Sequence, residues 1–350
     1  MQDILSEGGY VYSQFGGSQI ISESRRGFNA DLDLLKNGTA LRDTSAFCTL
    51  ELKGDDTLDF LNRITTNDLK NLRPGEGRRT IFCSDKGRII DSVLVVNEGT
   101  RFLIFGSAGS SDKLCRWINR YIITDDVHVK DITGNTGSFE IYGPQTQTVL
   151  ILMSGIKDEE PNKIYNFEFE EKPFSLIKYR FAGKIDRYLV YGDPRGFDKV
   201  AHFVLDYQGP FNIDFVSEAA IRRMNIHFGV PGESELTDIF NPHEVRLMDE
   251  VSLRKGCYIG QEVIARLDTY DKVQKLLTKL EVEPGLSTQL PAPLYDGEGK
   301  EAGLITTISS AGNTSLTFAL GMVRKSHLQD GGKLHVGDPG SKLIATIKEL

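Results

Sequence analysis

The order of the expected elements is the feature that most constrains the fold of this chain. Residues 47–132 predict a strand, a helix, a run of strands, a second helix and a closing strand, and a similar order recurs over 138–207. Two successive units of this kind indicate two α+β subdomains of split-βαβ character. The sequences of the two units do not match well, so we expect any repeat to be structural only.

Local signals place the helices and strands within these units. Leu58, Leu61 and Ile64 recur at helical spacing, and Asp55 or Asp56 can cap that helix. The expected helices cover 55–64, 111–122, 144–153, 196–207 and 217–229, and the expected strands cover 47–52, 79–83, 88–96, 101–105, 127–132, 138–143, 165–169, 174–179 and 187–192.

The chain changes character after residue 271. Short alternating segments separated by Gly, Pro and Asn follow, namely 275–282, 302–310, 316–324 and 333–337. This pattern predicts a small antiparallel barrel or sandwich. We therefore expect a region over 1–271, with an internal boundary near 135, and a C-terminal domain over 272–350.

Charge and hydropathy exclude two classes of partner. The 350 residues carry 41 Lys and Arg against 49 Asp and Glu, a formal charge of −8. Broad binding to nucleic acid needs a basic face, so we expect none. No apolar run reaches the roughly 18 residues of a membrane span. The segment MQDILSEGGYVYSQF lacks the basic and apolar regions of a secretory signal, so we expect a cytoplasmic protein.

The cysteines do not form a metal-binding pattern. Cys48 and Cys83 lie in apolar, strand-like runs and Cys115 lies in a helical pattern, so we expect these three to be small buried hydrophobic residues. Their wide spacing does not suggest a zinc site, and we expect no stably bound metal. Cys257 differs because its neighbours are Gly, Lys and Tyr.

Cys257 lies in the segment RKGCYIGQEVIARL. Gly260 begins a helix-like run, so the thiol is expected just before a helix N-terminus, where the helix dipole favours an anion. Lys255 adds a nearby cation, and the two together would favour the thiolate form. The flanking Gly256 and Gly260 allow a tight turn or a close approach to a ligand. The alternative is an ordinary loop–helix junction with an inert thiol.

Other polar positions have a structural and a functional interpretation. Asp91 lies in an apolar strand; it either faces solvent or points inward and needs hydrogen-bond donors. Asn67 with Asp68 is a turn or cap by the simpler interpretation. Arg222 lies on a solvated helix face or clamps a ligand carboxylate. Glu244 follows a histidine, but no second ligand lies at metal spacing. The motifs of phosphate loops, dinucleotide folds, zinc proteases and serine hydrolases are absent from the sequence.

The octapeptide KGCYIGQE, residues 255–262, resembles the K-G-C-[YF]-x-G-Q-E motif of the YgfZ family at every fixed position. The segments GDDTLDFLNRITTNDL, SDKGRIIDSVLVV, EVRLMDEVSLRKGCYIGQEVIAR and EAGLITTISSAGNTSLTFALGMVRK are similar to that family too. The likeness covers roughly residues 28–350. The family is related to the T-protein of the glycine cleavage system, an aminomethyltransferase that uses tetrahydrofolate.

This resemblance implies an α+β, T-protein-like folate-binding fold, with two split-βαβ subdomains and a C-terminal antiparallel barrel arranged as a ring. It implies tetrahydrofolate or a one-carbon derivative as cofactor. It also implies a role in iron–sulfur cluster assembly or repair, with iron–sulfur client or assembly proteins as partners and tRNA-modifying enzymes among those supported. The chemistry is assigned to Cys257, Lys255 and Asp91, and folate contacts to Asn67, Asp91, Arg222, Glu244, Tyr258 and Gln261.

Two alternatives remain open at the level of sequence. One is a T-protein-like aminomethyltransferase that makes methylene-tetrahydrofolate, with Asp91 orienting the folate. T-proteins usually carry an acid where this chain has Ser92 and a glutamate where it has Lys184, and they lack the K-G-C motif. The other is a catalytically inactive folate-binding module. Asn225 stands where the YgfZ family usually has an acid.

Overall fold

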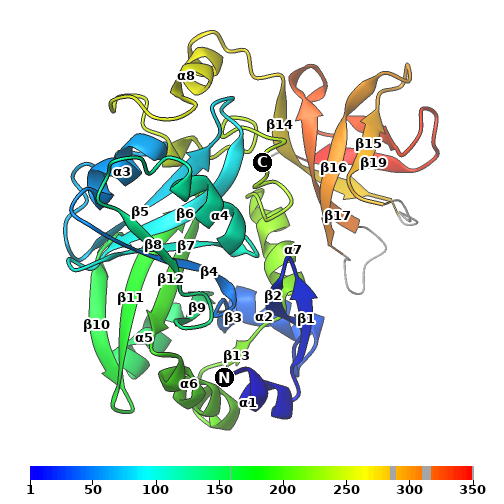
Figure 1. The fold of residues 1–350 in the computed structure, drawn as a ribbon. Coiled ribbons are helices and arrows are strands. Elements are labelled where there is room, and N and C mark those ends of the chain that lie inside the picture. The colour runs from blue at the N-terminus through cyan, green and yellow to red at the C-terminus, as the bar shows by residue number, and fades with distance from the viewer. Residues whose placement is uncertain (158, 284–288, 310–316, 349–350) are drawn as a thin grey trace.

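Three larger sheets and one N-terminal hairpin organise the chain (Figure 1). The computed structural model describes residues 1–157, 159–283, 289–309 and 317–348. The strand orders are β5-β6-β7-β4-β8 in a five-stranded sheet, β10-β11-β12-β9-β3-β13 in a six-stranded sheet and β14-β17-β16-β15-β18-β19 in a closed barrel. The expected α+β class is confirmed, and of the barrel and the sandwich the chain forms the barrel.

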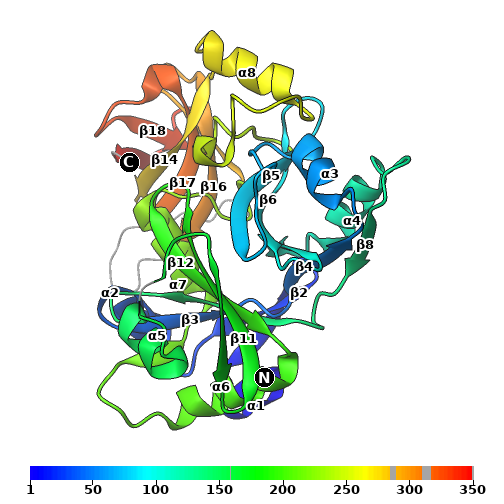
Figure 2. The same cartoon turned by 90° about the vertical axis from the view of Figure 1, so that its left-hand side faces the viewer.

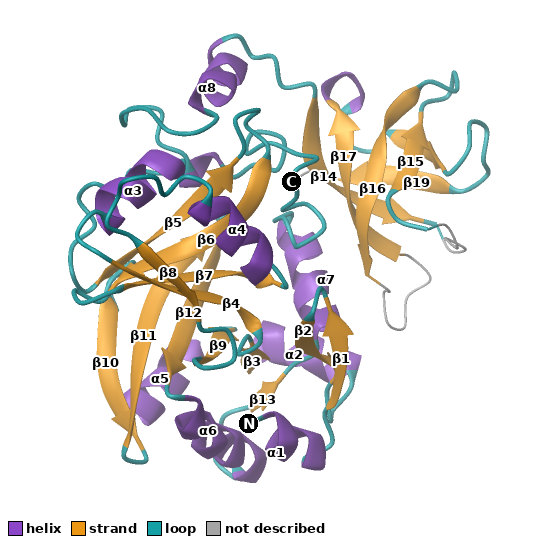
Figure 3. Cartoon of the chain, viewed as in Figure 1, coloured by secondary structure: helices purple, strands orange, loops and turns teal. Residues whose placement is uncertain are grey.

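The five-stranded sheet has the elements that the sequence predicts. Its strands are β4 (Phe47–Lys53), β5 (Glu76–Cys83), β6 (Ile89–Asn97), β7 (Phe102–Ala108) and β8 (His128–Asp131), and its helices are α3 (Thr57–Ile64) and α4 (Ser111–Asn119). The apolar stripes of α3 and α4 pack on this sheet: Phe60, Leu61, Leu114 and Ile118 are buried in one cluster with Val93 and other strand residues. Figure 3 shows both helices beside these strands.

The six-stranded sheet draws on distant parts of the sequence. It contains β3 (Thr39–Asp43), β9 (Gly137–Tyr142), β10 (Ile164–Phe169), β11 (Lys172–Phe181), β12 (Ile185–Gly192) and β13 (Ile213–Phe215), with α5 (Thr146–Ser154) and α6 (Pro194–Asp206). Strand β3 precedes the five-stranded sheet in sequence yet pairs with β9 and β13. Strand β3 thus belongs to the same sheet as β9–β13 although it precedes β4–β8 in the chain.

Two helix starts differ from the expected ones. The helix expected from Pro144 begins at Thr146, with Gln145 as its N-cap, because Gly143 has a left-handed φ of 105°. The helix expected from residue 196 begins earlier, at Pro194, because the Asp193 side chain accepts a hydrogen bond from the Arg195 backbone and caps it.

The remaining elements before the C-terminal barrel lie outside the two open sheets. They are α1 (Gln2–Glu7), β1 (Val11–Phe15), β2 (Ser18–Glu23), α2 (Phe28–Asn37), α7 (Glu218–Phe228), η1 (Met248–Glu250) and α8 (Gln261–Thr269). Ser217 is the N-cap of α7 and Gly229 its left-handed C-cap, as predicted. Figures 1 and 2 place α8 and the pair α1 and α6 at opposite ends of the molecule.

The C-terminal barrel packs beside α7. Its elements are β14 (Lys275–Val282), β15 (Ala292–Tyr295), β16 (Glu301–Ser309), β17 (Thr317–Arg324), η2 (Lys325–His327), β18 (Lys333–Val336) and β19 (Ile344–Lys348). Residues 310 and 316, within two of the expected strands, lie outside the described residues. No helix in the described ranges is long and apolar enough to cross a membrane.

Candidate functional site

A polar cavity lies where the two open sheets meet α7. Its walls come from β3 to β7, β9, β11, β12, α7 and the loop over 231–236, and its space is about 680 Å³ including the part open to solvent. Apolar side chains alternate there with charged and amide groups, which are Arg42, Arg79, Glu140, Arg187, Asn225 and Glu233. Charged side chains are rarely buried without partners, so this wall is the first candidate for a binding site.

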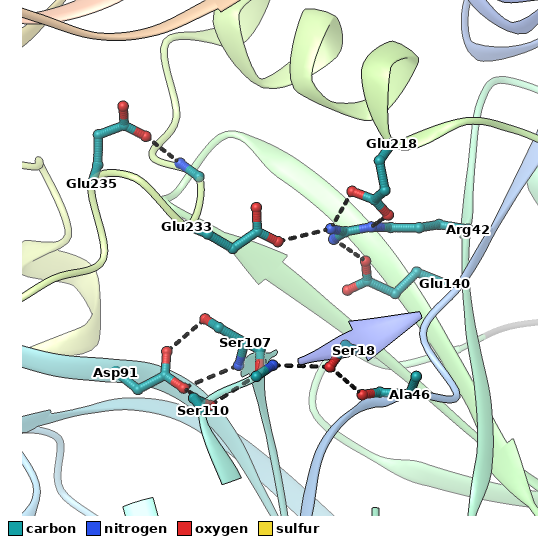
Figure 4. Close-up of polar contacts among 12 residues, drawn as sticks. Ser18, Arg42, Ala46, Asp91, Ser107, Ser110, Glu140, Glu218, Glu233 and Glu235 are labelled. Carbon is teal, nitrogen blue, oxygen red and sulfur yellow. Dashed lines mark hydrogen bonds and ion pairs between the residues drawn. The ribbon is translucent and has the colours of Figure 1, made fainter. Parts of the chain in front are cut away.

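Arg42 is the centre of an ion-pair cluster at this wall (Figure 4). Its Nε and Nη2 donate to the two carboxylate oxygens of Glu218 at 2.6 and 2.8 Å, a bidentate pair that joins β3 to α7. It also donates to Glu140 at 3.3 Å and to Glu233 at 3.2 Å. Burial raises the pKa of Glu218, and the contact with Arg42 opposes that rise.

Glu140 on β9 is held by four donors. Its Oε1 accepts from the Tyr179 hydroxyl and from Arg187, and its Oε2 accepts from the Tyr142 hydroxyl and from Arg42. Burial alone would raise the pKa of Glu140, but Arg187 and Arg42, with the two tyrosine hydroxyls, lower it to about 2. The carboxylate is therefore ionised throughout the neutral range.

Two buried polar atoms at the cavity wall have no hydrogen-bond partner in the described structure. These are Nε of Arg187, on β12, and Oδ1 of Asn225, on α7. An unpaired buried polar group costs about 1–3 kcal/mol, so each such group calls for an explanation. A ligand in the cavity would supply the missing acceptor and donor.

A second cavity lies beside the first, on the side of the barrel, and shares part of its wall. The two share Arg42, Asn225, Gly232 and Glu233, and the second is also lined by Arg222 and by residues of β16. The sequence prediction that Arg222 faces a ligand site is compatible with this position, because the side chain lines a cavity rather than only a solvated helix face.

Asp91 points inward, so the solvent-facing interpretation is wrong. The residue is 1% exposed on β6. Its Oδ1 accepts from the Ser92 backbone N–H at 2.9 Å and the Ser107 hydroxyl at 2.6 Å, and its Oδ2 accepts from the Ser107 backbone N–H at 3.0 Å and the Ser110 hydroxyl at 2.6 Å. Figure 4 shows the contacts of Asp91 with Ser107 and Ser110. Four donors fill the acceptor capacity of a carboxylate, so Asp91 orders the β6–β7 edge beneath the cavity.

The predicted Cys257 loop lies outside the central cavity. Cys257 is exposed, and α8 begins four residues later, after Gly260. Lys255 does not act on the thiol: its ammonium donates to the backbone carbonyls of Asn62 and Thr65 at 2.6 and 2.8 Å and to that of Asn67. Burial lowers the pKa of Lys255 to about 8. The lysine thus anchors the loop to the end of α3.

The other predicted residues are placed apart from the cavity. Asn67 donates from its side chain to the Arg79 carbonyl at 2.8 Å and so ties the segment after α3 to β5. Glu244 accepts from Arg88 at 3.2 Å and from the Asn241 backbone at 3.0 Å. The buried Tyr258 ring lies 5.2 Å below the Lys255 ammonium, and Gln261 opens α8. Of the predicted set, the structure brings together Lys255, Asn67 and Tyr258.

Residues that the sequence prediction missed make up the cavity wall. Glu140 lies in the otherwise apolar or aromatic run FEIY, whereas Arg42 and Arg187 each stand beside an aspartate, Asp43 and Asp186. The signal that drew attention to Asp91 would therefore have found Glu140 but not the two arginines. Cys48 and Cys83 are buried as expected, whereas Cys115 is only half-buried. Among the described residues, no group of three His, Cys, Asp or Glu side chains could hold a metal.

The two glycines that flank Cys257 are expected to differ in their tolerance of substitution. Gly260 has a φ of +83°, and a Cβ there would lie 2.5 Å from the Ser84 carbonyl in the β5–β6 turn. Gly260→Ala should therefore lower the free energy of unfolding by about 2 kcal/mol, measured by urea unfolding. Gly256→Ala is the matched control, because a Cβ there meets nothing within 4 Å. Equal stability of the two variants would contradict the close packing of this loop.

The chain is similar in sequence to one described family and to several named proteins. Residues 8–183 match the family described as the GCVT N-terminal domain. A chloroplastic protein of Arabidopsis thaliana that carries a transferase name is 28% identical, over 99% of this chain and 79% of that protein. An aminomethyltransferase of Desulfitobacterium hafniense is 24% identical, over 89% of this chain and 86% of its own.

A solved structure has the same fold. The glycine cleavage system aminomethyltransferase T from Bartonella henselae superimposes with a TM-score of 0.81, over 99% of this chain and 95% of that one, at 17% identity. The expected T-protein-like architecture is thereby confirmed.

Proposed function

Because this chain belongs to the GCVT N-terminal domain family, we propose that it binds tetrahydrofolate, or a one-carbon derivative of it, in the central cavity. The observation that carries the proposal is the pair of unpaired buried atoms, Arg187 Nε and Asn225 Oδ1, at the wall of that cavity. A pterin ring carries both hydrogen-bond donors and acceptors, so the donor set of the wall fits it. When bound, tetrahydrofolate would serve as a carrier of one-carbon groups.

The second cavity offers room for the rest of a folate. A folate ends in a glutamate tail, and a carboxylate there needs a cation. Arg222 lines the second cavity, which shares Arg42 and Glu233 with the wall of the first. The tail would lie between α7 and β16, with Arg222 as its partner, while the ring lies between the sheets. Arg222 keeps the role that the sequence assigned to it.

We further propose that the chain supports iron–sulfur cluster assembly or repair, as its resemblance to the YgfZ family implies. The exposed Cys257 supports this, because a thiol at the surface can reach a client or assembly protein, tRNA-modifying iron–sulfur enzymes included. Lys255 ties the loop to the end of α3 and Gly260 packs against the β5–β6 turn, so the position of the Cys257 loop is fixed at both ends. Its partner is a protein, and the folate site is separate from it.

An aminomethyltransferase is the second candidate, favoured by the names of relatives such as that of Desulfitobacterium hafniense. In this chain Asp91, which that alternative needs to orient the folate, accepts four hydrogen bonds and has no free acceptor position, so it is poorly placed for that role. Lys184, where a glutamate would be expected, donates to the Phe228 carbonyl at 3.0 Å. These contacts favour folate binding without aminomethyl transfer.

The experiment pairs two cysteine variants. Cys257→Ser should leave tetrahydrofolate affinity and unfolding free energy within error, because the side chain is exposed, while the activity of an iron–sulfur reporter enzyme in complemented cells falls several-fold. Cys115→Ser, a half-buried thiol on α4, should leave the reporter unchanged. Wild-type reporter activity with Cys257→Ser would remove the iron–sulfur proposal. Turnover of an aminomethylated lipoyl protein would favour the second candidate instead.

A further inference from the structure

We propose that Arg187 and Asn225 select the ligand by the lactam edge of its ring, the adjacent C4 carbonyl and N3–H of a 4-oxopteridine. The inference rests on the proposed folate function and adds which edge of the ring is recognised. The four contacts of Arg42 and the four donors of Asp91 leave little spare capacity in those groups. Arg187 Nε and Asn225 Oδ1, by contrast, have no hydrogen-bond partner in the described structure.

Arg187 is a buried cation with unused donors. Its side chain is 8% exposed, and a guanidinium carries five N–H groups. The contact found for it is with Glu140 at 3.5 Å, at the outer limit of a hydrogen bond, and its Nε has none. The guanidinium carbon lies 4.0 Å from the centre of the Phe181 ring, which fixes the plane of the group. Arg187 lines the cavity, so an acceptor that reaches its Nε there would complete the missing hydrogen bond.

Asn225 supplies a hydrogen-bond acceptor from a helix, whereas Arg187 supplies a donor from a strand. It lies on α7, is 8% exposed and lines both cavities. Its Oδ1 has no donor in the described structure. A carbonyl oxygen that enters the cavity can accept from Arg187 Nε, and the N–H beside it can donate to Asn225 Oδ1.

The arrangement should discriminate against a 4-aminopteridine. That ring has an amino donor at C4 and an unprotonated acceptor at N3. The donor and the acceptor of this edge are therefore exchanged relative to the 4-oxo ring. The Asn225 amide can rotate to offer its N–H, but a guanidinium has donors only and cannot adapt. Glu140 cannot accept from the amino group, because four donors already occupy its oxygens. Arg187 is thus the stricter of the two residues.

The test compares two ligands by calorimetry on the full chain. The ligands are tetrahydrofolate and the 5,6,7,8-tetrahydro form of 4-amino-4-deoxyfolate. Wild type should bind the amino ligand at least about 100-fold more weakly, since a site that leaves buried polar groups unpaired rejects an analogue strongly. Arg187→Met should weaken tetrahydrofolate binding about 30-fold but change binding of the amino ligand little, so the ratio falls below about 10.

The controls separate this inference from the proposed function. Arg180→Met makes the same change on β11, where Arg180 is exposed and pairs with Asp186, and should keep the wild-type ratio. Asn225→Leu keeps the volume and should weaken both ligands about 10-fold without changing their ratio, because the rotated amide pairs with either ring. Arg187→Gln, whose amide can also accept, carries the test where Arg187→Met does not fold, and should lower the ratio below about 10. Equal binding of both ligands by wild type overturns the inference alone. Absence of tetrahydrofolate binding overturns the proposed function, and the inference with it.

Discussion

Glu140→Gln is expected to lower the free energy of unfolding by about 3–5 kcal/mol at pH 7, the cost of breaking a buried ion pair from one side. The change removes the charge that Arg42 and Arg187 share but keeps the size of the side chain. Arg42 retains its bidentate contact with Glu218, whereas Arg187 is left as a buried cation without a carboxylate. Urea unfolding of the variant and of wild type measures the difference.

The difference in unfolding free energy between wild type and Glu140→Gln should depend on pH, and this dependence identifies Glu140 as its source. The pKa of Glu140 falls from its ordinary value of 4.5 to about 2 in the folded chain, so the unfolded chain binds more protons between these values. Its stabilisation is therefore complete above about pH 5 and is lost as the pH falls towards 2; the shift corresponds to about 3 kcal/mol. Burial raises the pKa of Glu218, which acts in the opposite direction, so the measured quantity is wild type minus variant.

An exposed carboxylate provides the matched control. Glu298→Gln removes a partner of Lys300 in a pair whose two side chains are largely exposed, and it should change the unfolding free energy by less than about 1 kcal/mol. A loss below about 1 kcal/mol for Glu140→Gln, or a difference that does not shrink between pH 5 and 2, would contradict the buried cluster.

The sequence predicts those parts of the fold that depend on local pattern. The stripe of Leu58, Leu61 and Ile64 gives α3, and the turn before Gly87 gives the β5–β6 hairpin, because helical periodicity and turn chemistry are properties of neighbouring residues. The place of β3 could not be predicted in this way. Its partners β9 and β13 lie far along the chain, and pairing over such distances leaves no local signal.

At the candidate site, too, local sequence signals were predictive and long-range contacts were not. Asp91 could be flagged because a lone acid in an apolar strand needs partners, and the structure supplies them from Ser107 and Ser110. The cluster around Arg42 could not be assembled from sequence, because Arg42 meets Glu140 across 98 positions and Glu218 across 176. The position of the K-G-C loop outside the cavity likewise depends on tertiary packing.

Gly232→Phe is expected to abolish tetrahydrofolate binding with little effect on stability. Gly232 lines both cavities, and a Cβ there would meet nothing closer than 3.6 Å, so the backbone accepts a side chain without strain. A phenyl ring at this point would occupy cavity space beside Asn225. We expect affinity to fall at least about 100-fold through steric exclusion, and the unfolding free energy to change by less than about 1 kcal/mol.

Titration calorimetry of tetrahydrofolate against wild type, Gly232→Phe and Gly297→Phe tests the location of the folate site most directly. Gly297 lies in the C-terminal domain, where a Cβ meets nothing within 4 Å, so it controls for the added ring. The account predicts one bound folate per chain in wild type and in Gly297→Phe, and no measurable heat of binding in a folded Gly232→Phe. Undiminished binding by Gly232→Phe, or none by wild type, would contradict it.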